Sequence, residues 1–360
     1  MTQAANNHKL RIGITIGDVN GIGPELVIKA FSEAHLRDMC TPILYGSSRV
    51  LNIYRKVLQV NKFNYEVVTN PSQAKSRRLN LIECIPDLER IEIGKHSEIG
   101  GKAAYLSLKR AIEDAQHKEL DALVTLPVDK AALQMHDPNF KGHTELLAEA
   151  FNMPDDLMLM VSETLKVGLV TNHLPLHDVS RNLTVDRIVS KARLLHRSLE
   201  VDFSIRQPMI AVLGLNPHAG DRGLIGSEEE QIIKKAIEVL EAEGIRAIGP
   251  YPSDGYFGSL TYLRFDATLA MYHDQGLIPF KLLSGYEGVN FTAGLPFIRT
   301  SPDHGVAYDI AGKGTADPAS LRQALYMAID IHERRTMNEA LRANVLPTYD
   351  TVDRRPSKGE

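Results

Sequence analysis

The chain has 360 residues, of which 43% are hydrophobic and 24% are charged, the composition of an ordinary globular protein. Its formal net charge of -4 argues against a surface that binds nucleic acid or an anionic membrane. The length exceeds what one hydrophobic core serves comfortably. We therefore expect one two-lobed unit over 1–350, with lobes formed from discontinuous segments, followed by a charged tail over 351–360.

The two cysteines, Cys40 and Cys84, predict no disulfide framework and fit a reducing environment. The first nine residues are polar and lack the apolar core of a signal peptide. No apolar run in the sequence approaches the length of a membrane span. We therefore expect a cytoplasmic protein. A small phosphorylated ligand is compatible with this charge, because it needs only a local cluster of donors.

Predicted strands and helices alternate along the chain. In the first half we predict strands over 10–16, 42–46 and 122–126, helices over 26–33, 49–59, 99–118 and 143–151, and a strand-poor stretch over 61–95. In the second half we predict strands over 167–170, 210–213 and 267–271, helices over 185–199, 227–243 and 319–344, and a glycine-rich stretch from 272 to 299. This alternation predicts an α/β fold, and the short apolar strands predict a mainly parallel sheet.

Three of the predicted strands are followed by a histidine, namely His173, His218 and His273. Ligands of an open α/β sheet bind at the carboxyl ends of its strands. Three neutral imidazoles with open coordination positions are one way in which proteins hold a catalytic divalent metal. One histidine at a strand end is more often a polar cap, but the recurrence favours a metal site formed by all three.

Two glycine-containing turns leave alternatives open. Residues 17–23 contain three glycines between a strand and a helix, but they match neither the dinucleotide-binding fingerprint nor a P-loop. They form either an anion site or a tight structural turn. At 141–145, His143 and Thr144 stand at a predicted helix start. They either bind phosphate or carboxylate, or serve as an ordinary helix cap, which this stretch alone favours.

Two later segments have structural interpretations. Ser227 with Glu230 fits a capping box, and the glutamates there are most simply a solvated first turn. The segment 249–257 is too rich in turn residues to belong to the core. Its carboxylate, Asp254, forms either an Asx turn or a contact to substrate or metal.

A polar cluster follows the third histidine. It begins with Asp274 and includes the donors Lys281, Asn290 and Arg299 in a glycine- and proline-rich span, which we predict to be long loops. Together the three donors can hold an oxyanion, with the arginine in bidentate fashion. The alternative is loop solvation and salt bridges.

Six segments together resemble one known family, over residues from about Leu10 to about Asn344. They are GDVNGIGPE, GHTELLAE, LNPHAGDRGLIGSEE, YPSDGYF, MYHDQGLIPFK and GVNFTAGLPFIRTSPDHGVAYDIAGKGTADPAS. The chain thereby resembles the 4-hydroxythreonine-4-phosphate dehydrogenases of pyridoxal phosphate (vitamin B6) synthesis. Departures from the family pattern at Val19-Asn20 and at 278–280 touch no metal or phosphate position.

The resemblance implies a fold like that of isocitrate and isopropylmalate dehydrogenases. It implies a homodimer whose active site lies in the interlobe cleft at the subunit interface. It further implies NAD or NADP and a divalent metal, with zinc first and magnesium, manganese or cobalt as alternatives. In such a site the metal ligands match His173, His218 and His273, one of them from the partner subunit. The substrate contacts match His143, Thr144, Lys281, Asn290 and Arg299, and Lys281, Asp254 and Asp274 become the candidate catalytic residues.

The reaction implied is NAD-dependent oxidation of 4-phosphohydroxy-L-threonine at C3. Its product, 2-amino-3-oxo-4-phosphooxybutanoate, decarboxylates to 3-amino-2-oxopropyl phosphate. The first alternative is a D-threonate or D-erythronate 4-phosphate dehydrogenase of sugar-acid catabolism. Two interpretations remain. One is a metal-dependent phosphatase or acyl transferase, and the other is a non-catalytic metal-binding dimer.

Overall fold

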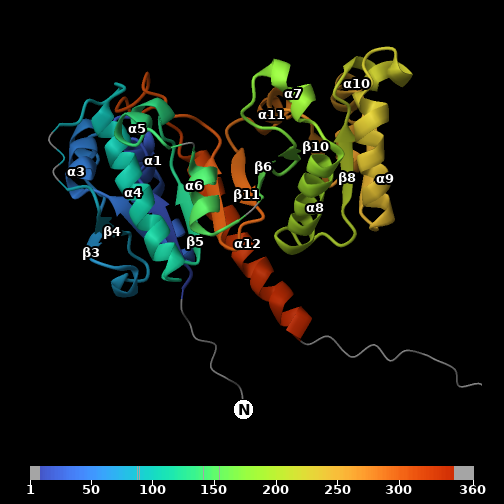
Figure 1. The fold of residues 1–360 in the computed structure, drawn as a ribbon. Helices are drawn as coiled ribbons and strands as arrows, with labels where there is room; N and C mark the ends of the chain where they lie inside the picture. The colour runs from blue at the N-terminus through green and yellow to red at the C-terminus, as the bar shows by residue number, and fades with distance from the viewer. Residues whose placement is uncertain (1–8, 87, 89, 141, 154, 344–360) are drawn as a thin grey trace, which may run out of the picture.

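The structure, a computed structural model, describes residues 9–343 except 87, 89, 141 and 154, so the tail expected over 351–360 lies outside the described residues. Through the described part runs a twelve-stranded sheet in the order β3-β4-β2-β1-β5-β12-β11-β6-β7-β10-β8-β9. Figure 1 shows one group of helices around α1, α3 and α4 and another around α8 and α9, with β6, β11 and α12 between them.

The sheet consists of two parallel blocks joined by antiparallel strands. The first block contains β1 (Arg11–Thr15), β2 (Thr41–Gly46), β3 (Glu66–Val68), β4 (Asn80–Glu83), β5 (Ala122–Thr125) and β12 (Ile298–Pro302). The second contains β7 (Lys166–Leu169), β8 (Met209–Leu213), β9 (Arg246–Tyr251) and β10 (Ala267–Ala270). Between them, β11 (Val289–Ala293) and β6 (Leu157–Val161) pair in antiparallel fashion with each other and with their outer neighbours. The predicted α/β class with a mainly parallel sheet is confirmed.

The strands are apolar because helices cover the sheet. Every residue of β2, β5 and β10 is buried, which is typical of parallel strands covered on both faces. In the first block, α4 packs on β1, β2 and β5. In the middle, α12 packs on β5, β11 and β12, and α8 packs on β6, β7 and β11. None of the described helices is long and apolar enough to span a membrane.

Side-chain caps mark where several helices begin. Ser47, Ser97, Asp129 and Thr184 each accept a hydrogen bond from a backbone N–H in the first turn that follows, which stabilises each helix by about 1 kcal/mol. The helices are α1 (Gly23–Ser32), α2 (His35–Met39), α3 (Ser48–Val57), α4 (Glu98–Gln116), α5 (Lys130–His136), α6 (His143–Ala150), α7 (Leu176–Asn182), α8 (Val185–Val201), α9 (Lys234–Ala242), α10 (Ser253–Gly258), α11 (His273–Ser284) and α12 (Ala319–Ala343), with short 3-10 or π turns at 71–73, 217–223, 229–233 and 261–264.

Several local predictions were wrong. The span 272–299 is not a set of long loops, because it forms α11, β11 and the start of β12. By contrast, the stretch 61–95 is strand-poor as predicted, with only the short strands β3 and β4 among its described residues, and the helix predicted over 227–243 is present, with a π turn at 229–233 before α9. The segment 249–257 does reach the core, because Tyr256 is buried and hydrogen-bonds to Thr268 on β10. At 272–299 and 249–257, tertiary packing overrides the turn-rich composition of the sequence.

Candidate functional site

The order of the strands brings the three histidines to one edge of the sheet. The parallel strands β7, β10 and β8 are neighbours, and His173, His273 and His218 follow their carboxyl ends in that order. The imidazole centroids of His173 and His273 lie 5.9 Å apart. His218 is exposed in the 3-10 segment 217–223, and no three His, Cys, Asp or Glu side chains gather as a metal site among the residues that the structure describes. One chain therefore pairs two of the histidines and leaves the third apart.

The surroundings of His273 suit a metal ligand. Its Nδ1 lies 2.7 Å from Oδ1 of Asp274, the next residue on α11. Since an ionised carboxylate only accepts hydrogen bonds, this contact places the ring proton on Nδ1 and leaves the lone pair of Nε2 available. A carboxylate behind a histidine is the usual support of metal-bound imidazoles. The donor set thus fits a divalent metal, with Asp274 orienting the ligand.

A buried carboxylate holds the segment that carries His218. Glu229 accepts hydrogen bonds from the backbone N–H of Leu215 at 2.8 Å and of Asn216 at 2.7 Å. Its other oxygen accepts from the Asn216 side chain at 2.9 Å, and only 1% of the residue is exposed. The expectation of solvated glutamates was therefore wrong for Glu229, because the adjacent loop has free amides for its carboxylate to satisfy.

The predicted capping box is replaced by other contacts. The Ser227 backbone N–H donates to Glu228, and the Glu230 carboxylate pairs with Lys234. Nearby, residues 218–222 all have positive φ values, between 39° and 77°. Such left-handed backbone costs about 1–2 kcal/mol for each residue with a side chain. The hydrogen bonds of Glu229 at the start of this segment offset part of that cost.

A buried cation lies on the first parallel block. Arg299 on β12 is 3% exposed. Its Nε and Nη2 donate to Thr125 Oγ1 at 3.0 and 2.7 Å, and its Nη1 donates to Thr292 Oγ1 at 3.1 Å. Burial lowers the pKa of the guanidinium to about 10, so it stays charged at neutral pH. Within the described part of the chain no carboxylate forms an ion pair with it, and a buried charge held by hydroxyls alone is suited to an anionic ligand.

Two unpartnered polar atoms accompany this cation. His143 Nε2 and Asn290 Oδ1 are both buried, and no described residue hydrogen-bonds to them. Burial, and to a smaller extent the positive charges of Arg299 and Lys130, lower the pKa of His143 to about 3. The imidazole is therefore neutral at physiological pH. Thr144 follows in the first turn of α6, so three of the predicted substrate contacts lie in this region, and Asn290 is on β11 two residues before Thr292.

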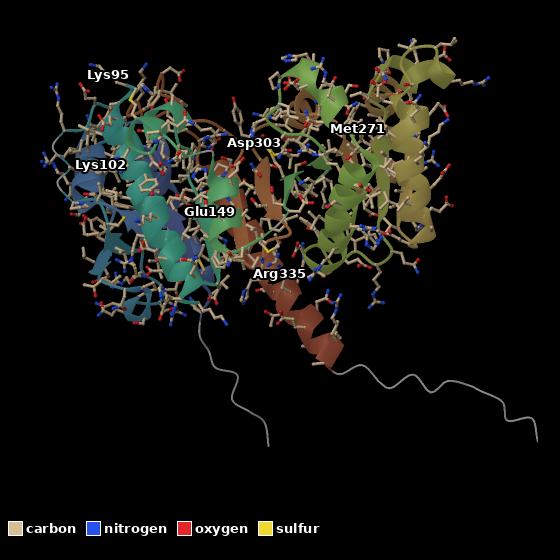
Figure 2. All side chains as sticks on the ribbon, viewed as in Figure 1. Lys95, Lys102, Glu149, Met271, Asp303 and Arg335 are labelled. Carbon is tan, nitrogen blue, oxygen red and sulfur yellow. The ribbon has the colours of Figure 1, made fainter. Side chains whose placement is uncertain are left out.

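Lys281 on α11 pairs with Asp303 near the histidine edge. Its Nζ lies 3.6 Å from Oδ1 of Asp303 and donates to the Asp303 carbonyl at 3.4 Å. Burial raises the pKa of Asp303, while the charges of Lys281 and His273 act in the opposite direction. Figure 2 shows Asp303 between the two groups of helices, and Met271, which directly follows β10, within the second group. By contrast, Asp254 is exposed on α10, which contacts the His218 segment.

Three residues near the site escaped the sequence analysis. Lys130, at the start of α5, acts on the pKa of both His143 and His173. Asp303 binds Lys281, and His304 has a buried, unpartnered Nε2. The signal for Lys130 was its place directly after a predicted strand. The other two lie in a segment that the family resemblance included without a role for them.

The glycine turn at 17–23 is closed by its own hydrogen bonds. The Asp18 N–H donates to the Pro127 carbonyl, and the Gly21 N–H donates to the Asp18 carbonyl. Gly17 has a φ of +70°, and a Cβ there would lie 2.5 Å from the Pro127 oxygen. These contacts favour the structural turn over the anion site.

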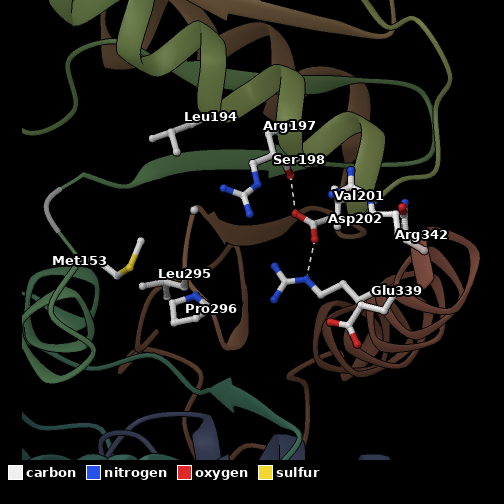
Figure 3. A pocket seen from close by; sticks show the side chains of 13 residues that line it. Met153, Leu194, Arg197, Ser198, Val201, Asp202, Leu295, Pro296, Glu339 and Arg342 are labelled. Carbon is white, nitrogen blue, oxygen red and sulfur yellow. Dashed lines mark hydrogen bonds and ion pairs between the residues drawn. The ribbon is translucent and has the colours of Figure 1, made fainter. Parts of the chain in front are cut away.

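A cavity of about 430 Å³ lies away from the histidines, between α8, α12 and residues 294–296. Figure 3 shows Asp202 in its wall, where the carboxylate accepts hydrogen bonds from Ser198 at 2.7 Å and Arg335 at 2.6 Å. None of the predicted site residues lines it. The candidate site is thus defined by convergent polar groups and not by this cavity.

Comparisons with known proteins show the family of this chain. The family profile of "Pyridoxal phosphate biosynthetic protein PdxA" matches residues 38–328. The 4-hydroxythreonine-4-phosphate dehydrogenase of Bacteroides thetaiotaomicron is 46% identical over 340 residues, covering 94% of this chain and 93% of that protein. The D-threonate 4-phosphate dehydrogenase of Cupriavidus necator is 39% identical over 329 residues, covering 90% and 98%.

A solved structure gives the same result. The crystal structure of 4-hydroxythreonine-4-phosphate dehydrogenase from Klebsiella pneumoniae superposes with a TM-score of 0.78 at 36% identity, covering 91% of this chain and 99% of that chain. The profile match, the sequence identity and the shared fold extend over nearly the whole protein. The chain belongs to the PdxA family of pyridoxal phosphate biosynthetic proteins.

Proposed function

We propose that this protein oxidises 4-phosphohydroxy-L-threonine at C3 with a nicotinamide cofactor, in the synthesis of pyridoxal 5'-phosphate. The observation that carries the proposal is the buried, hydroxyl-bound Arg299, whose charge acts on the unpartnered imidazole of His143. This arrangement suits an anionic group of a small substrate. The names of its relatives supply the reaction class, because they are dehydrogenases acting on 4-phosphates of four-carbon acids.

The anion-binding residues have distinct roles in this proposal. Arg299 supplies charge and a planar fork of donors, which binds phosphate or carboxylate in bidentate fashion. Neutral His143 and the hydroxyl of Thr144 supply further hydrogen bonds, and Asn290 adds an amide group. Because these groups are fixed on α6, β11 and β12, they orient the substrate relative to the histidine edge.

We assign a divalent metal, zinc first, to His173, His218 and His273. The pairing of His173 with His273 and the carboxylate behind His273 support this assignment. Since the three histidines do not gather as a metal site among the described residues of one chain, we further propose a homodimer in which a partner subunit completes the histidine set. When bound, the metal polarises the C3 oxygen and so favours loss of its proton.

The oxidation removes a hydride from C3 and a proton from its hydroxyl. The nicotinamide ring accepts the hydride, and we propose NAD as the cofactor. Lys281 is positioned by Asp303 to contact the C3 oxygen or to accept its proton. The 3-oxo acid then loses carbon dioxide, and the Lys281 ammonium can stabilise the negative charge that develops. Asp274 acts by holding His273, and Asp254 stays a candidate through its place beside the His218 segment.

D-threonate 4-phosphate is the alternative substrate. The Cupriavidus necator relative carries that name at 39% identity. This substrate has a hydroxyl where 4-phosphohydroxythreonine has an amine, so the two substrates share the phosphate and carboxylate groups and differ at this one position. The free thiols of Cys40 and Cys84 agree with the cytoplasmic location that we expect.

The proposal is tested by product analysis. Purified protein reconstituted with zinc is incubated with NAD and 4-phosphohydroxy-L-threonine, and NADH and carbon dioxide are measured together. We expect equal amounts of the two products, and none from an Arg299→Met control at the same substrate concentration. Release of inorganic phosphate without NADH would instead support the phosphatase reading.

A further inference from the structure

Lys130 is the first residue of α5 and lies over the start of α6. Its Nζ is 3.6 Å from the point that a Cβ on Gly142 would occupy, and Gly142 directly precedes His143 and Thr144. The positive charge of Lys130 lowers the pKa of His143, on which the charge of Arg299 also acts. It also lowers the pKa of His173, which belongs to the histidine edge. The ammonium group therefore faces both halves of the candidate site.

The charges around Lys130 are not balanced. No described carboxylate lies within ion-pair distance of its Nζ. The positive charge of Arg299 acts on the same imidazole, and Glu145 is the carboxylate that acts on Arg299 and on His173. Besides Asp129, whose carboxylate is held by His96 and Tyr308, two cations and one carboxylate thus share this part of the site. An incoming oxyanion would restore neutrality there.

The base of Lys130 is firmly held. Asp129 caps α5 by accepting from the N–H groups of Ala131 at 2.9 Å and Ala132 at 3.2 Å. The other Asp129 oxygen lies 2.7 Å from His96 Nδ1 and 3.2 Å from the Tyr308 hydroxyl. Because His96 and Tyr308 come from two separate segments, they fix Asp129 and with it the first turn of α5. The Lys130 side chain therefore extends from a fixed point.

We propose that Lys130 is a further substrate-binding residue whose Nζ contacts an oxyanion of the substrate between Arg299 and the histidine edge. This inference rests on the proposed function, since it needs a substrate that carries phosphate and carboxylate groups. The shared chemistry is a charge-assisted hydrogen bond from an ammonium to an oxyanion. Lys130 binds and orients, and the proton transfer is left to other groups.

The test compares Lys130→Met and Lys130→Arg with Lys102→Met. Lys102 is an exposed lysine on α4, which Figure 2 places on the outer side of the first helix group. We expect Lys130→Met to raise KM for the phosphorylated substrate by about tenfold to a hundredfold, the loss typical of one charge-assisted hydrogen bond. Lys130→Arg should recover part of this loss, and Lys102→Met should leave KM within about twofold of the original protein.

Calorimetry with inorganic phosphate, without NAD, gives a readout that does not depend on turnover. A weaker phosphate affinity in Lys130→Met places Nζ on the phosphate, whereas an unchanged affinity with a raised KM places it on the carboxylate. An unchanged KM together with an unchanged phosphate affinity would overturn the inference. If the unmodified protein gives no NADH, the proposed function fails, and with it the placement of Nζ on a substrate carboxylate. Weaker phosphate binding in Lys130→Met would then still support an oxyanion contact, and unchanged phosphate binding would overturn it. Thermal unfolding checks that each variant folds. If Lys130→Met does not fold, Lys130→Gln takes its place in the same measurements.

Discussion

The imidazole of His173 lies beside that of His273, with a centroid separation of 5.9 Å. The pairing follows from the register of the sheet, in which Leu169 at the end of β7 is the neighbour of Ala270 at the end of β10. Each histidine comes a few residues after its strand, so neighbouring strand ends deliver both rings to the same edge. This relationship is the structural basis for assigning a metal there.

Removing either ring should therefore abolish metal-dependent turnover. We expect His173→Ala and His273→Ala each to lower kcat/KM by about a hundredfold or more, since a metal supplies several kcal/mol of charge stabilisation. Asp274→Asn, which removes the carboxylate behind His273, should weaken zinc affinity by about tenfold to a hundredfold. Competition with a chelator measures that affinity. Zinc binding unaffected by both alanine variants would remove the metal from this edge.

The guanidinium of Arg299 should not be replaceable by an ammonium. Arg299→Lys keeps the charge but loses the fork that reaches both an anion and Thr125. We expect KM for the 4-phosphate substrate to rise by about tenfold or more. Thr125→Val should raise KM by about threefold to tenfold, because it leaves the guanidinium without two of its hydrogen bonds. Initial-rate kinetics of both variants test this, and an Arg299→Lys enzyme with ordinary KM would contradict it.

The buried His143 should make stability depend on pH. The pKa of His143 is about 3 in the folded protein, against an ordinary value of 6.5 in the unfolded chain. Below about pH 6.5 the unfolded chain therefore binds a proton that the folded protein does not bind. Stability contributed by this group is therefore present at pH 7 and is lost as the pH falls towards 3. Between pH 7 and pH 5 the free energy of unfolding should drop by about 2 kcal/mol from this residue.

Urea unfolding of the original protein and of His143→Asn, both with a chelator present, isolates that contribution. Both proteins keep the charged groups around this position. These are Arg299 and Lys130, which act on His143, and Glu145, whose carboxylate acts on Arg299. The drop between the two pH values should be smaller in the variant by about 2 kcal/mol. Equal drops in the two proteins would show that His143 titrates normally.

Glu229 should contribute to both stability and the histidine set. Glu229→Ala leaves two backbone N–H groups of the His218 segment without their acceptor, which should lower the free energy of unfolding by about 2–4 kcal/mol. Glu230→Ala is the matched control, because that exposed carboxylate pairs only with exposed Lys234, and its cost should stay below about 1 kcal/mol. Denaturant titrations measure both, and equal losses would contradict the special role of Glu229.

Much of the fold was predictable from local pattern. The predicted strands over 122–126, 210–213 and 267–271 correspond to β5, β8 and β10 within one or two residues, because fully buried strands are continuous apolar runs. The strand order, which makes neighbours of β7, β10 and β8, was not predictable. It depends on long-range packing that no local pattern encodes.

The polar groups were harder to predict than the strands. Glutamates 228–230 look alike in sequence, but only Glu229 is buried, because the amides it satisfies belong to a loop fourteen residues away at Leu215. Lys130 belongs to no motif that the sequence shows, and the role that we propose for it depends on the position of α5 over Gly142. Arg299 was assigned to a loop, although a strand fixes it, since the apolar stretches around it are short and interrupted by glycine and proline.

The most direct test of the account is the rate of NADH formation from 4-phosphohydroxy-L-threonine and from D-threonate 4-phosphate, measured side by side with zinc-reconstituted protein. The account predicts that kcat/KM is higher for the amino substrate by at least about tenfold. A preference for D-threonate 4-phosphate, or no NADH from either substrate, would contradict the assignment to pyridoxal phosphate synthesis.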